Sequence, residues 1–244
     1  MIILAHRGNL SGISGSLENS PELLKQALGL GFGIETDIRR TDSGDLYISH
    51  DRATELSGEL SERTATGHAA LWRQFPRQPV AVNVKEAGYE DQLVEFLVQH
   101  DLVQQAFLFD FELIERTPGT TARYFRSLHP HVRLAARASD RHGESIDQAL
   151  SIDCAEIVWL DEFDSLWARK ADVFRLKQAG KIIFAISPEI HGFPLERAER
   201  RWREFAEWGV DGLCTDWPVW AAELLGRQPQ MARSSRNSQT KGDS

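Results

Sequence analysis

The sequence has little of what several classes of protein require. Among its 244 residues are only two cysteines, Cys154 and Cys214, which form neither a closely spaced metal-binding motif nor a disulfide framework and so favour a reducing cytoplasm. No apolar run approaches the roughly 18 residues that a membrane-spanning helix needs. Residues 1–5 are apolar but lack the basic flank of a signal peptide. We therefore expect a cytoplasmic protein without an integral membrane segment.

A basic surface and a nucleotide-binding turn are also lacking. The formal net charge is −8, and because a broad nucleic-acid footprint needs a basic face, we expect no nucleic-acid partner. No Gly-x-Gly-x-x-Gly turn follows an expected strand, which disfavours a dinucleotide-binding fold. Residues 227–244 have almost no apolar side chains to offset the entropy of ordering. They are expected to form a disordered polar tail after a single domain at residues 1–226.

What the sequence does contain is a regular alternation of apolar, strand-like runs with amphipathic, helix-like runs. Eight runs have strand character: 1–5, 33–38, 80–85, 106–110, 132–137, 156–161, 181–187 and 211–216. Parallel strands joined by helical crossovers account for this order, and eight such units in this length predict an α/β fold, the closed (β/α)₈ TIM-type barrel. After the second strand, a turn at 42–45 and an apolar run at 46–49 predict a short hairpin.

The second strand carries two acids on one face. In residues 33–40, alternation places Glu35 and Asp37 together, and buried carboxylates side by side need a compensating cation or proton. A divalent metal is the simplest compensation, because hard cations bind carboxylate oxygens. The alternative is a solvated edge strand whose acids pair with Arg39 and Arg40, and this stretch alone favours neither interpretation.

Polar side chains stand at the carboxyl ends of the expected strands, where the active sites of such barrels lie. In chain order they are His6, Arg7, Glu35, Asp37, Asn83, Lys85, Asp110, Arg137, Asp161, Glu189, His191 and Asp216. Each alone has a simpler explanation as a helix cap or a member of a salt bridge. Together they indicate a site for an anionic substrate that is held by a metal and by cations.

Two pairs of residues, Arg7 with Lys85 and His6 with His50, have properties that suit phosphate chemistry. Arg7 offers a bidentate fork and Lys85 a point charge for phosphate oxygens. His6 and His50 can divide the acid and base roles, because imidazole exchanges protons near neutral pH. The last six residues of the series are expected to set specificity: Asp110, Arg137, Asp161, Glu189, His191 and Asp216.

Short motifs in the first fifty residues resemble a known family. In order and spacing, His6-Arg7-Gly8, Glu18-Asn19-Ser20, Glu35-x-Asp37 and His50-Asp51 are similar to the glycerophosphodiester phosphodiesterases, and Thr215-Asp216-x-Pro218 resembles the closing strand of that family. The resemblance implies a TIM-type barrel that hydrolyses phosphodiesters with a divalent metal, Mg²⁺ or Ca²⁺. It makes His6 and His50 the acid–base pair, places Glu35 and Asp37 on the metal and puts Arg7 and Lys85 near the phosphate. Glu18, Asn19 and Asp51 are expected to support this site.

One position departs from the family's pattern. A third acidic ligand usually stands two residues before the lysine, whereas this chain has Asn83-Val84-Lys85. An amide oxygen can bind Mg²⁺ or Ca²⁺ but supplies no charge. Asn83 is therefore expected to be a neutral metal ligand, unless another acid such as Asp110 or Glu189 contributes.

The predicted function is metal-dependent hydrolysis of a small-molecule phosphodiester, a glycerophosphodiester above all, to a phosphomonoester and an alcohol. The nucleophile is either water or a neighbouring hydroxyl of the substrate. Asn83 leaves a second hypothesis open, a catalytically weakened barrel that binds phosphodiester headgroups. A third is a phospholipid phosphodiesterase similar to sphingomyelinase D, whose barrel shares the histidine and Glu-x-Asp pattern.

Overall fold

The computed structural model describes residues 1–55 and 60–227. Eight parallel strands form a barrel, which closes because β1 pairs with both β2 and β9. The barrel strands are β1 (Ile2–His6), β2 (Gly33–Arg40), β4 (Val80–Val84), β5 (Ala106–Phe109), β6 (Arg133–Ala138), β7 (Ile157–Leu160), β8 (Ile182–Ile186) and β9 (Gly212–Thr215). The predicted TIM-type barrel is confirmed. The predicted tail, apart from Arg227, lies outside the described residues.

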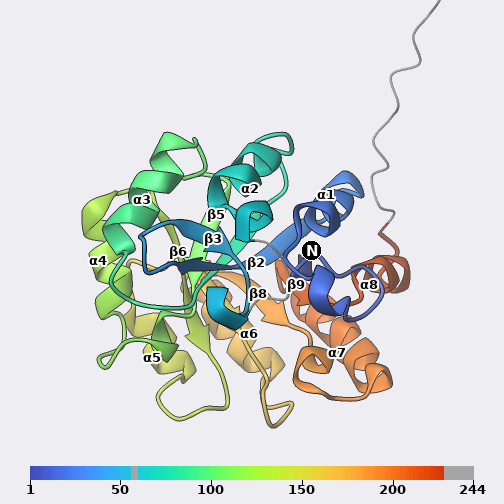
Figure 1. The fold of residues 1–244 in the computed structure, drawn as a ribbon. Coiled ribbons are helices and arrows are strands. Elements are labelled where there is room, and N and C mark those ends of the chain that lie inside the picture. The colour runs from blue at the N-terminus through green and yellow to red at the C-terminus, as the bar shows by residue number, and fades with distance from the viewer. Residues whose placement is uncertain (56–59, 228–244) are drawn as a thin grey trace, which may run out of the picture.

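Helices surround the strands, as Figure 1 shows. They are α1 (Pro21–Gly29), α2 (Ala65–Trp72), α3 (Glu90–Gln99), α4 (Thr120–Leu128), α5 (Ile146–Ser151), α6 (Lys170–Gln178), α7 (Leu195–Trp208) and α8 (Pro218–Leu224). The start of α1 follows from its sequence, because the Ser20 hydroxyl accepts a hydrogen bond from the Leu23 N–H and Pro21 occupies the first helical position. Across residues 1–55 and 60–227, no helix combines the length and the apolar character needed to cross a membrane.

The predicted hairpin is present as β3 (Leu46–Ile48), which pairs antiparallel with the end of β2. Ile38 lies opposite Ile48 in this pairing, so the hairpin extends beyond the barrel and returns the chain to the barrel mouth. The Ser49 N–H then donates to the carbonyl oxygen of Asp37. This bond fixes where the chain continues to His50.

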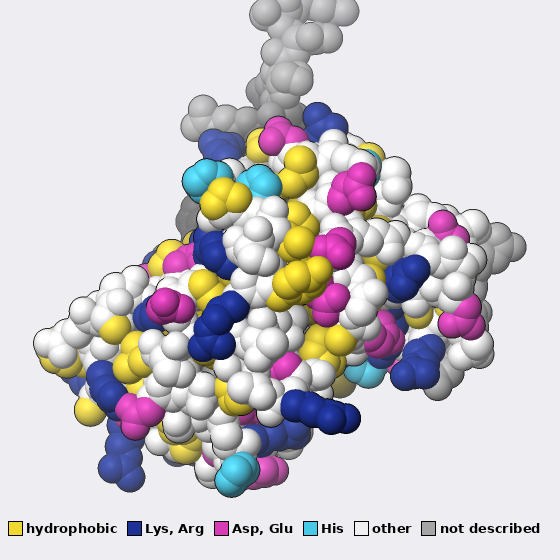
Figure 2. Space-filling model, turned by 90° about the vertical axis from the view of Figure 1, so that its left-hand side faces the viewer, with side chains coloured by type: hydrophobic (Ala, Val, Ile, Leu, Met, Phe, Trp, Pro, Cys, Tyr) yellow, Lys and Arg dark blue, Asp and Glu magenta, His cyan; other side chains and the backbone are white. Residues whose placement is uncertain are grey.

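Two apolar cores hold the barrel. The larger lies between the strands and the helices, and the smaller fills the barrel interior. Aromatic rings dominate the interior: Phe107 contacts Phe184 with ring centroids 5.1 Å apart, and Phe109 lies 4.1 Å from Trp159. Because this plug fills the barrel, polar side chains gather only at its ends. On the outer face formed by α3, α4 and α5, hydrophobic side chains are interspersed with charged ones (Figure 2).

Gly33 is required where β2 enters the barrel. A Cβ atom there would lie 2.4 Å from Leu4 Cδ2 and 2.8 Å from the carbonyl oxygen of Pro79. We expect Gly33→Ala to lower the free energy of unfolding by about 1–3 kcal/mol, because backbone as well as side chain must shift. Urea unfolding measures the change.

Gly29 is the matched control, because no atom lies within 4 Å of the position that its Cβ would take. Gly29 is the last residue of α1, where alanine restricts the unfolded chain, so Gly29→Ala is expected to be neutral or to stabilise by up to about 1 kcal/mol. Equal stabilities of the two variants would contradict this account of β2.

Candidate active site

The register of three strands brings the predicted residues together at the carboxyl end of the barrel. His6 lies opposite Glu35, and Asp37 lies opposite Asn83. A cavity of about 160 Å³ lies at this end and is here called the mouth cavity. Nine predicted residues line it: His6, Arg7, Glu35, Asn83 and Lys85 on or after β1, β2 and β4, and Asp110, Arg137, Asp161 and His191 on or after β5 to β8.

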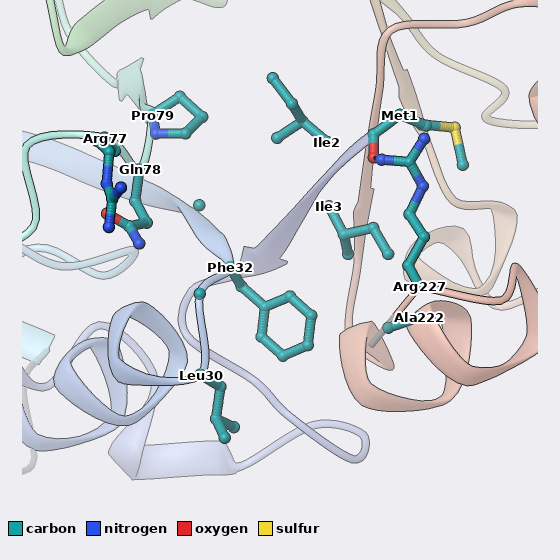
Figure 3. Close-up of a pocket in the computed structure, with 12 residues that line it drawn as sticks. Met1, Ile2, Ile3, Leu30, Phe32, Arg77, Gln78, Pro79, Ala222 and Arg227 are labelled. Atoms are coloured by element: carbon teal, nitrogen blue, oxygen red, sulfur yellow. Dashed lines mark hydrogen bonds between the residues drawn. The ribbon is translucent and has the colours of Figure 1, made fainter. Parts of the chain in front are cut away.

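A larger cavity, of about 580 Å³, lies at the opposite end, where β1 and β2 begin (Figure 3). Ile2, Phe32 and Pro79 give it apolar walls, and its only charged lining residues among the described part of the chain are Arg77 and Arg227. Without a carboxylate or an imidazole it has no group for acid–base chemistry. The candidate site is therefore the smaller mouth cavity.

His6 is held by a carboxylate. Its Nδ1 lies 2.7 Å from Asp216 Oδ1, and its Nε2 lies 3.8 Å from Glu35 Oε2. Burial lowers the pKa of His6, but the hydrogen bond to Asp216 and the charges of Glu35 and Asp216 outweigh it and raise this pKa above its ordinary value. Asp216, which the sequence analysis assigned to specificity, thus acts on His6. Its Oδ1 also accepts a hydrogen bond from Asn9 Nδ2 at 2.7 Å.

The pKa values of the two acids of β2 are shifted in opposite directions. Burial, followed by the charge of Asp37, raises the pKa of Glu35 to about 7. Burial also raises the pKa of Asp37, but the charges of Lys85 and Arg7 more than offset it and hold this pKa below its ordinary value. Lys85 Nζ lies 3.2 Å from Asp37 Oδ1, and Arg7 Nε lies 3.2 Å from Asp37 Oδ2. Asp37 is therefore the ionised member of the pair.

The alternative of a solvated edge strand is wrong. Glu35 and Asp37 are 2% and 0% exposed. Arg39 instead pairs with Glu86 and donates to the carbonyl oxygen of His50 at 2.8 Å. The acids of β2 face the barrel interior, where their partners come from neighbouring strands and loops.

The loop after β1 contacts both acids of β2. Arg7 has a positive φ of 51°, which lets its N–H donate to Glu35 Oε2 at 3.2 Å while its guanidinium reaches Asp37 and Glu18. Asn19 Nδ2 donates to Asp37 Oδ2 at 2.8 Å, and Glu18 accepts from Arg7 and from Asn9. Glu18 therefore positions Arg7, which lines the mouth cavity, and Asn19 positions Asp37.

His50 lies on the other side of Arg7. It lines a separate pocket of about 120 Å³, here called the outer pocket, together with Arg7, Glu18, Asn19, Asp51 and Arg63. His50 Nδ1 lies 2.8 Å from Asp51 Oδ1, and the two side chains are 45% and 59% exposed. The structure thus places His50 in one pocket with Arg7 but not in the cavity that His6 lines.

Asn83, Asp110, Arg137, Asp161 and His191 form one polar chain along the side of the mouth cavity opposite His6. This side is here called the far wall. Asn83 Nδ2 donates to Asp110 Oδ2 at 2.7 Å, and the Arg137 guanidinium donates to Asp110 Oδ1. Arg137 Nη2 lies 3.8 Å from Asp161 Oδ2, and His191 Nε2 lies 2.6 Å from Asp161 Oδ1. A role of these residues in specificity stays a prediction.

Both acids considered as substitute metal ligands are engaged in hydrogen bonds. Both carboxylate oxygens of Asp110 accept hydrogen bonds from the polar chain. In Glu189, one oxygen accepts from Thr215 Oγ1 and from the Asp216 N–H, and the other accepts from Ser187 Oγ. A contribution of either acid to a metal site stays a prediction.

The donors of β2 and β4 suit a hard divalent cation. The described residues contain no group of three or more His, Cys, Asp or Glu side chains that could hold a metal. Glu35, Asp37 and the amide of Asn83 offer oxygen donors alone, which is the preference of Mg²⁺ and Ca²⁺. Asp37 Oδ1 is buried and accepts no hydrogen bond within the described chain. The residues present thus fit such an ion, with Arg7 and Lys85 sharing the charge of Asp37.

Sequence reasoning missed several residues of the site. Asn9 is fully buried and joins Asp216 to Glu18, and its place directly after His6-Arg7-Gly8 was the available signal. Arg141 stacks on Phe163, with its guanidinium carbon 3.6 Å from the ring centroid, and both line the mouth cavity. Arg141 lies in the loop after β6 and Phe163 in the loop after β7. The rule that active sites lie at the carboxyl ends of barrel strands indicates these loops, but it does not say which of their residues take part.

Comparison with known proteins identifies the fold. No protein-family model matches the chain, and no curated protein matches it in sequence. A protein of Galdieria sulphuraria assigned to the glycerophosphodiester phosphodiesterases superposes with a TM-score of 0.72, at 17% identity over 93% of this chain and 98% of that one. A glycerophosphodiester phosphodiesterase of Parabacteroides distasonis superposes with a TM-score of 0.70, at 17% identity over 92% of this chain and 96% of that one. The glycerophosphodiester phosphodiesterase of Thermotoga maritima superposes with a TM-score of 0.62, at 17% identity over 92% of this chain and 98% of that one. The resemblance read from the motifs is confirmed for the fold.

Glu112 offers a test of the electrostatics beneath the far wall. It accepts a hydrogen bond from the Arg137 N–H, its Oε2 is buried without a hydrogen-bond partner among the described residues, and burial raises its pKa from 4.5 to about 7. A carboxyl whose pKa is higher in the folded protein binds a proton on folding, so its contribution to stability falls as the pH rises through this range.

We therefore expect Glu112→Gln to stabilise the protein more at pH 8 than at pH 5, by about 1–2 kcal/mol. Urea unfolding at the two pH values measures this difference. Glu207→Gln is the control, because Glu207 is 73% exposed and should give the same change at both. A pH-independent effect of Glu112→Gln would show that its carboxyl titrates normally.

Proposed function

We propose that this chain is a phosphoric diester hydrolase that cleaves a glycerophosphodiester to a phosphomonoester and an alcohol. The observation that carries the proposal is the mouth cavity, where the Asp216-bound imidazole of His6 lies beside Glu35, Arg7 and Lys85. The fold shared with proteins named glycerophosphodiester phosphodiesterases supports it.

Arg7 and Lys85 provide the phosphate-binding charge. Arg7 directly follows β1 and Lys85 directly follows β4, and the two bind different oxygens of the Asp37 carboxylate. A phosphodiester anion that lies against them receives a guanidinium fork and an ammonium point charge. As negative charge builds up on the phosphoryl oxygens in the transition state, these fixed cations stabilise it without reorganising.

His6 is the first proton-transfer group. Because Asp216 binds its Nδ1, the Nε2 atom is left to take a proton from the attacking nucleophile. Asp216 fixes the ring and its tautomer, as a carboxylate partner does for catalytic imidazoles generally. A second group must protonate the departing alcohol, and the sequence motif nominates His50 for it.

Glu35, Asp37 and Asn83 would hold a divalent cation, Mg²⁺ or Ca²⁺. When bound, such an ion would polarise the phosphoryl group and reduce the repulsion between the two carboxylates. Because Asn83 adds no charge, the donor set carries one negative charge fewer than three acids would. This observation also supports the second candidate, a barrel that binds headgroups without turnover.

Activity decides between the two candidates. Wild-type protein is expected to hydrolyse glycerophosphodiesters, and His6→Asn is expected to lower kcat by about 10²- to 10⁴-fold, because general acid–base catalysis contributes this much. Release of the alcohol with and without chelator measures it. His131→Asn, which changes an exposed histidine distant from the mouth cavity in the chain, is the control. Headgroup binding by calorimetry with no turnover under any metal would select the binding barrel.

Metal binding is tested separately from turnover. We expect wild-type protein to bind Mg²⁺ or Ca²⁺ in calorimetry and Glu35→Gln to weaken that binding at least about 10-fold, since an amide supplies no charge to the ion. Glu207→Gln, at an exposed position, should bind as wild type does. Equal affinities of the wild type and Glu35→Gln would remove Glu35 from the metal site.

A further inference from the structure

Asn19 joins the loop after β1 to the second strand. Its side chain donates from Nδ2 to Asp37 Oδ2 at 2.8 Å and accepts from Thr36 Oγ1 at 2.6 Å. Its backbone N–H donates to the carbonyl oxygen of Arg7 at 2.9 Å. Asn19 is buried and has a positive φ of 61°, a left-handed conformation that is uncommon for residues other than glycine. Such a conformation persists only where the surrounding contacts hold it.

The remaining polar group of Asn19, its carbonyl oxygen, is bound by a histidine of α2. His68 Nε2 lies 3.0 Å from this oxygen, and the His68 side chain is fully buried. Within the described part of the chain, no other donor reaches the Asn19 carbonyl. A buried carbonyl that loses its only donor is costly, so the imidazole is the contact that lets Asn19 keep its conformation.

The position of the ring hydrogen follows from the two contacts of His68. Its Nδ1 lies 2.9 Å from the carbonyl oxygen of Thr64, which already accepts the backbone N–H of His68. Burial, together with the charge of Arg63, lowers the pKa of His68, so near pH 7 the ring is neutral and carries one N–H. Because Thr64 has another donor and Asn19 has none among the described residues, the hydrogen belongs on Nε2.

The segment that carries this ring is itself anchored at the mouth of the barrel. Thr64, the N-cap residue of α2, forms a β-bridge with Tyr47 of β3. Arg63 donates to the carbonyl oxygens of Ser16 and Glu18 at 2.9 and 3.0 Å. The start of α2 is therefore tied both to the hairpin and to the loop after β1, so a donor on this helix has a fixed place relative to that loop.

We propose that His68 is a positioning residue of the phosphodiesterase site, which fixes the amide of Asn19 and through it the carboxylate of Asp37. The proposal rests on the phosphodiesterase function above. The bond from Asn19 holds Asp37 Oδ2, and the other oxygen, Oδ1, then lies 3.2 Å from Lys85 Nζ and accepts no hydrogen bond within the described chain. Without the His68 donor the Asn19 peptide relaxes, its amide moves, and Asp37 loses the bond that sets its orientation.

Two substitutions separate the donor from the volume of the ring. His68→Gln keeps an N–H near the place of Nε2, whereas His68→Leu fills a similar space without a donor. We expect His68→Leu to lower kcat/KM on the glycerophosphodiester that wild-type protein cleaves fastest by about 10- to 100-fold, and His68→Gln by less than about 3-fold, since a displacement of about 1 Å at a site can cost this much. Trp72→Phe is the packing control, because this buried ring of α2 lies 6.2 Å from the His68 ring, and it should leave kcat/KM unchanged.

A double-mutant cycle shows whether His68 acts through Asn19. Asn19→Gly permits the positive φ but removes the amide that binds Asp37. In that background His68→Leu has no amide to displace, so its effect on kcat/KM is expected to fall below about 3-fold. Lower stability alone would give the same factor in both backgrounds, and urea unfolding measures the stability of each variant.

The outcomes separate the alternatives. Equal losses in His68→Leu and His68→Gln would make His68 a packing residue and overturn the proposal. An unchanged kcat/KM in His68→Leu, or the same loss with and without the Asn19 amide, would overturn it as well. If wild-type protein cleaves no glycerophosphodiester, the proposed function fails and the role of His68 fails with it. If wild-type protein is active and His6→Asn is not, the function stands, and the cycle alone decides the role of His68.

Discussion

The burial of two neighbouring carboxylates on β2 governs the rest of the site. Glu35 and Asp37 are almost inaccessible to solvent, and each lone carboxylate in such a position is strongly unfavourable. Asp37 is stabilised by Arg7, Lys85 and Asn19, whereas burial and the charge of Asp37 raise the pKa of Glu35 to about 7. The strained backbone of Arg7 and the loop after β1 exist to supply these partners.

The same electrostatic reasoning explains the asparagine on β4. Asn83 donates to Asp110 Oδ2 at 2.7 Å, and Asp110 is itself bound to Arg137. A glutamate or aspartate in this position would bring a further negative charge to a carboxylate that is already buried, which would raise the repulsion instead of adding a bond. The amide satisfies Asp110 and still keeps an oxygen. The departure from the family's pattern is thus matched by Asp110 and by the polar chain behind it.

Much of this arrangement could be predicted from the sequence, because it depends on periodicity. Alternation within β2 placed Glu35 and Asp37 on one face, and the rule that parallel strands end at one rim brought His6, Asn83 and Lys85 to them. The partner of His6 could not be predicted, since Asp216 reaches it only through barrel closure between β1 and β9. The placement of His50 and His191 depends on loop conformation, about which periodicity carries no information.

The polar residues of the barrel mouth come from two groups of strands. The paired acids lie on β2 and the cations Arg7 and Lys85 directly follow β1 and β4, whereas the aromatic and polar wall comes from β5 to β8 and their loops. Because the two groups touch mainly through the bond between Asn83 and Asp110, the far wall can change with little effect on the acids of β2. His191 belongs by position to the far wall but is tied through Glu189 to the loop of Asp216.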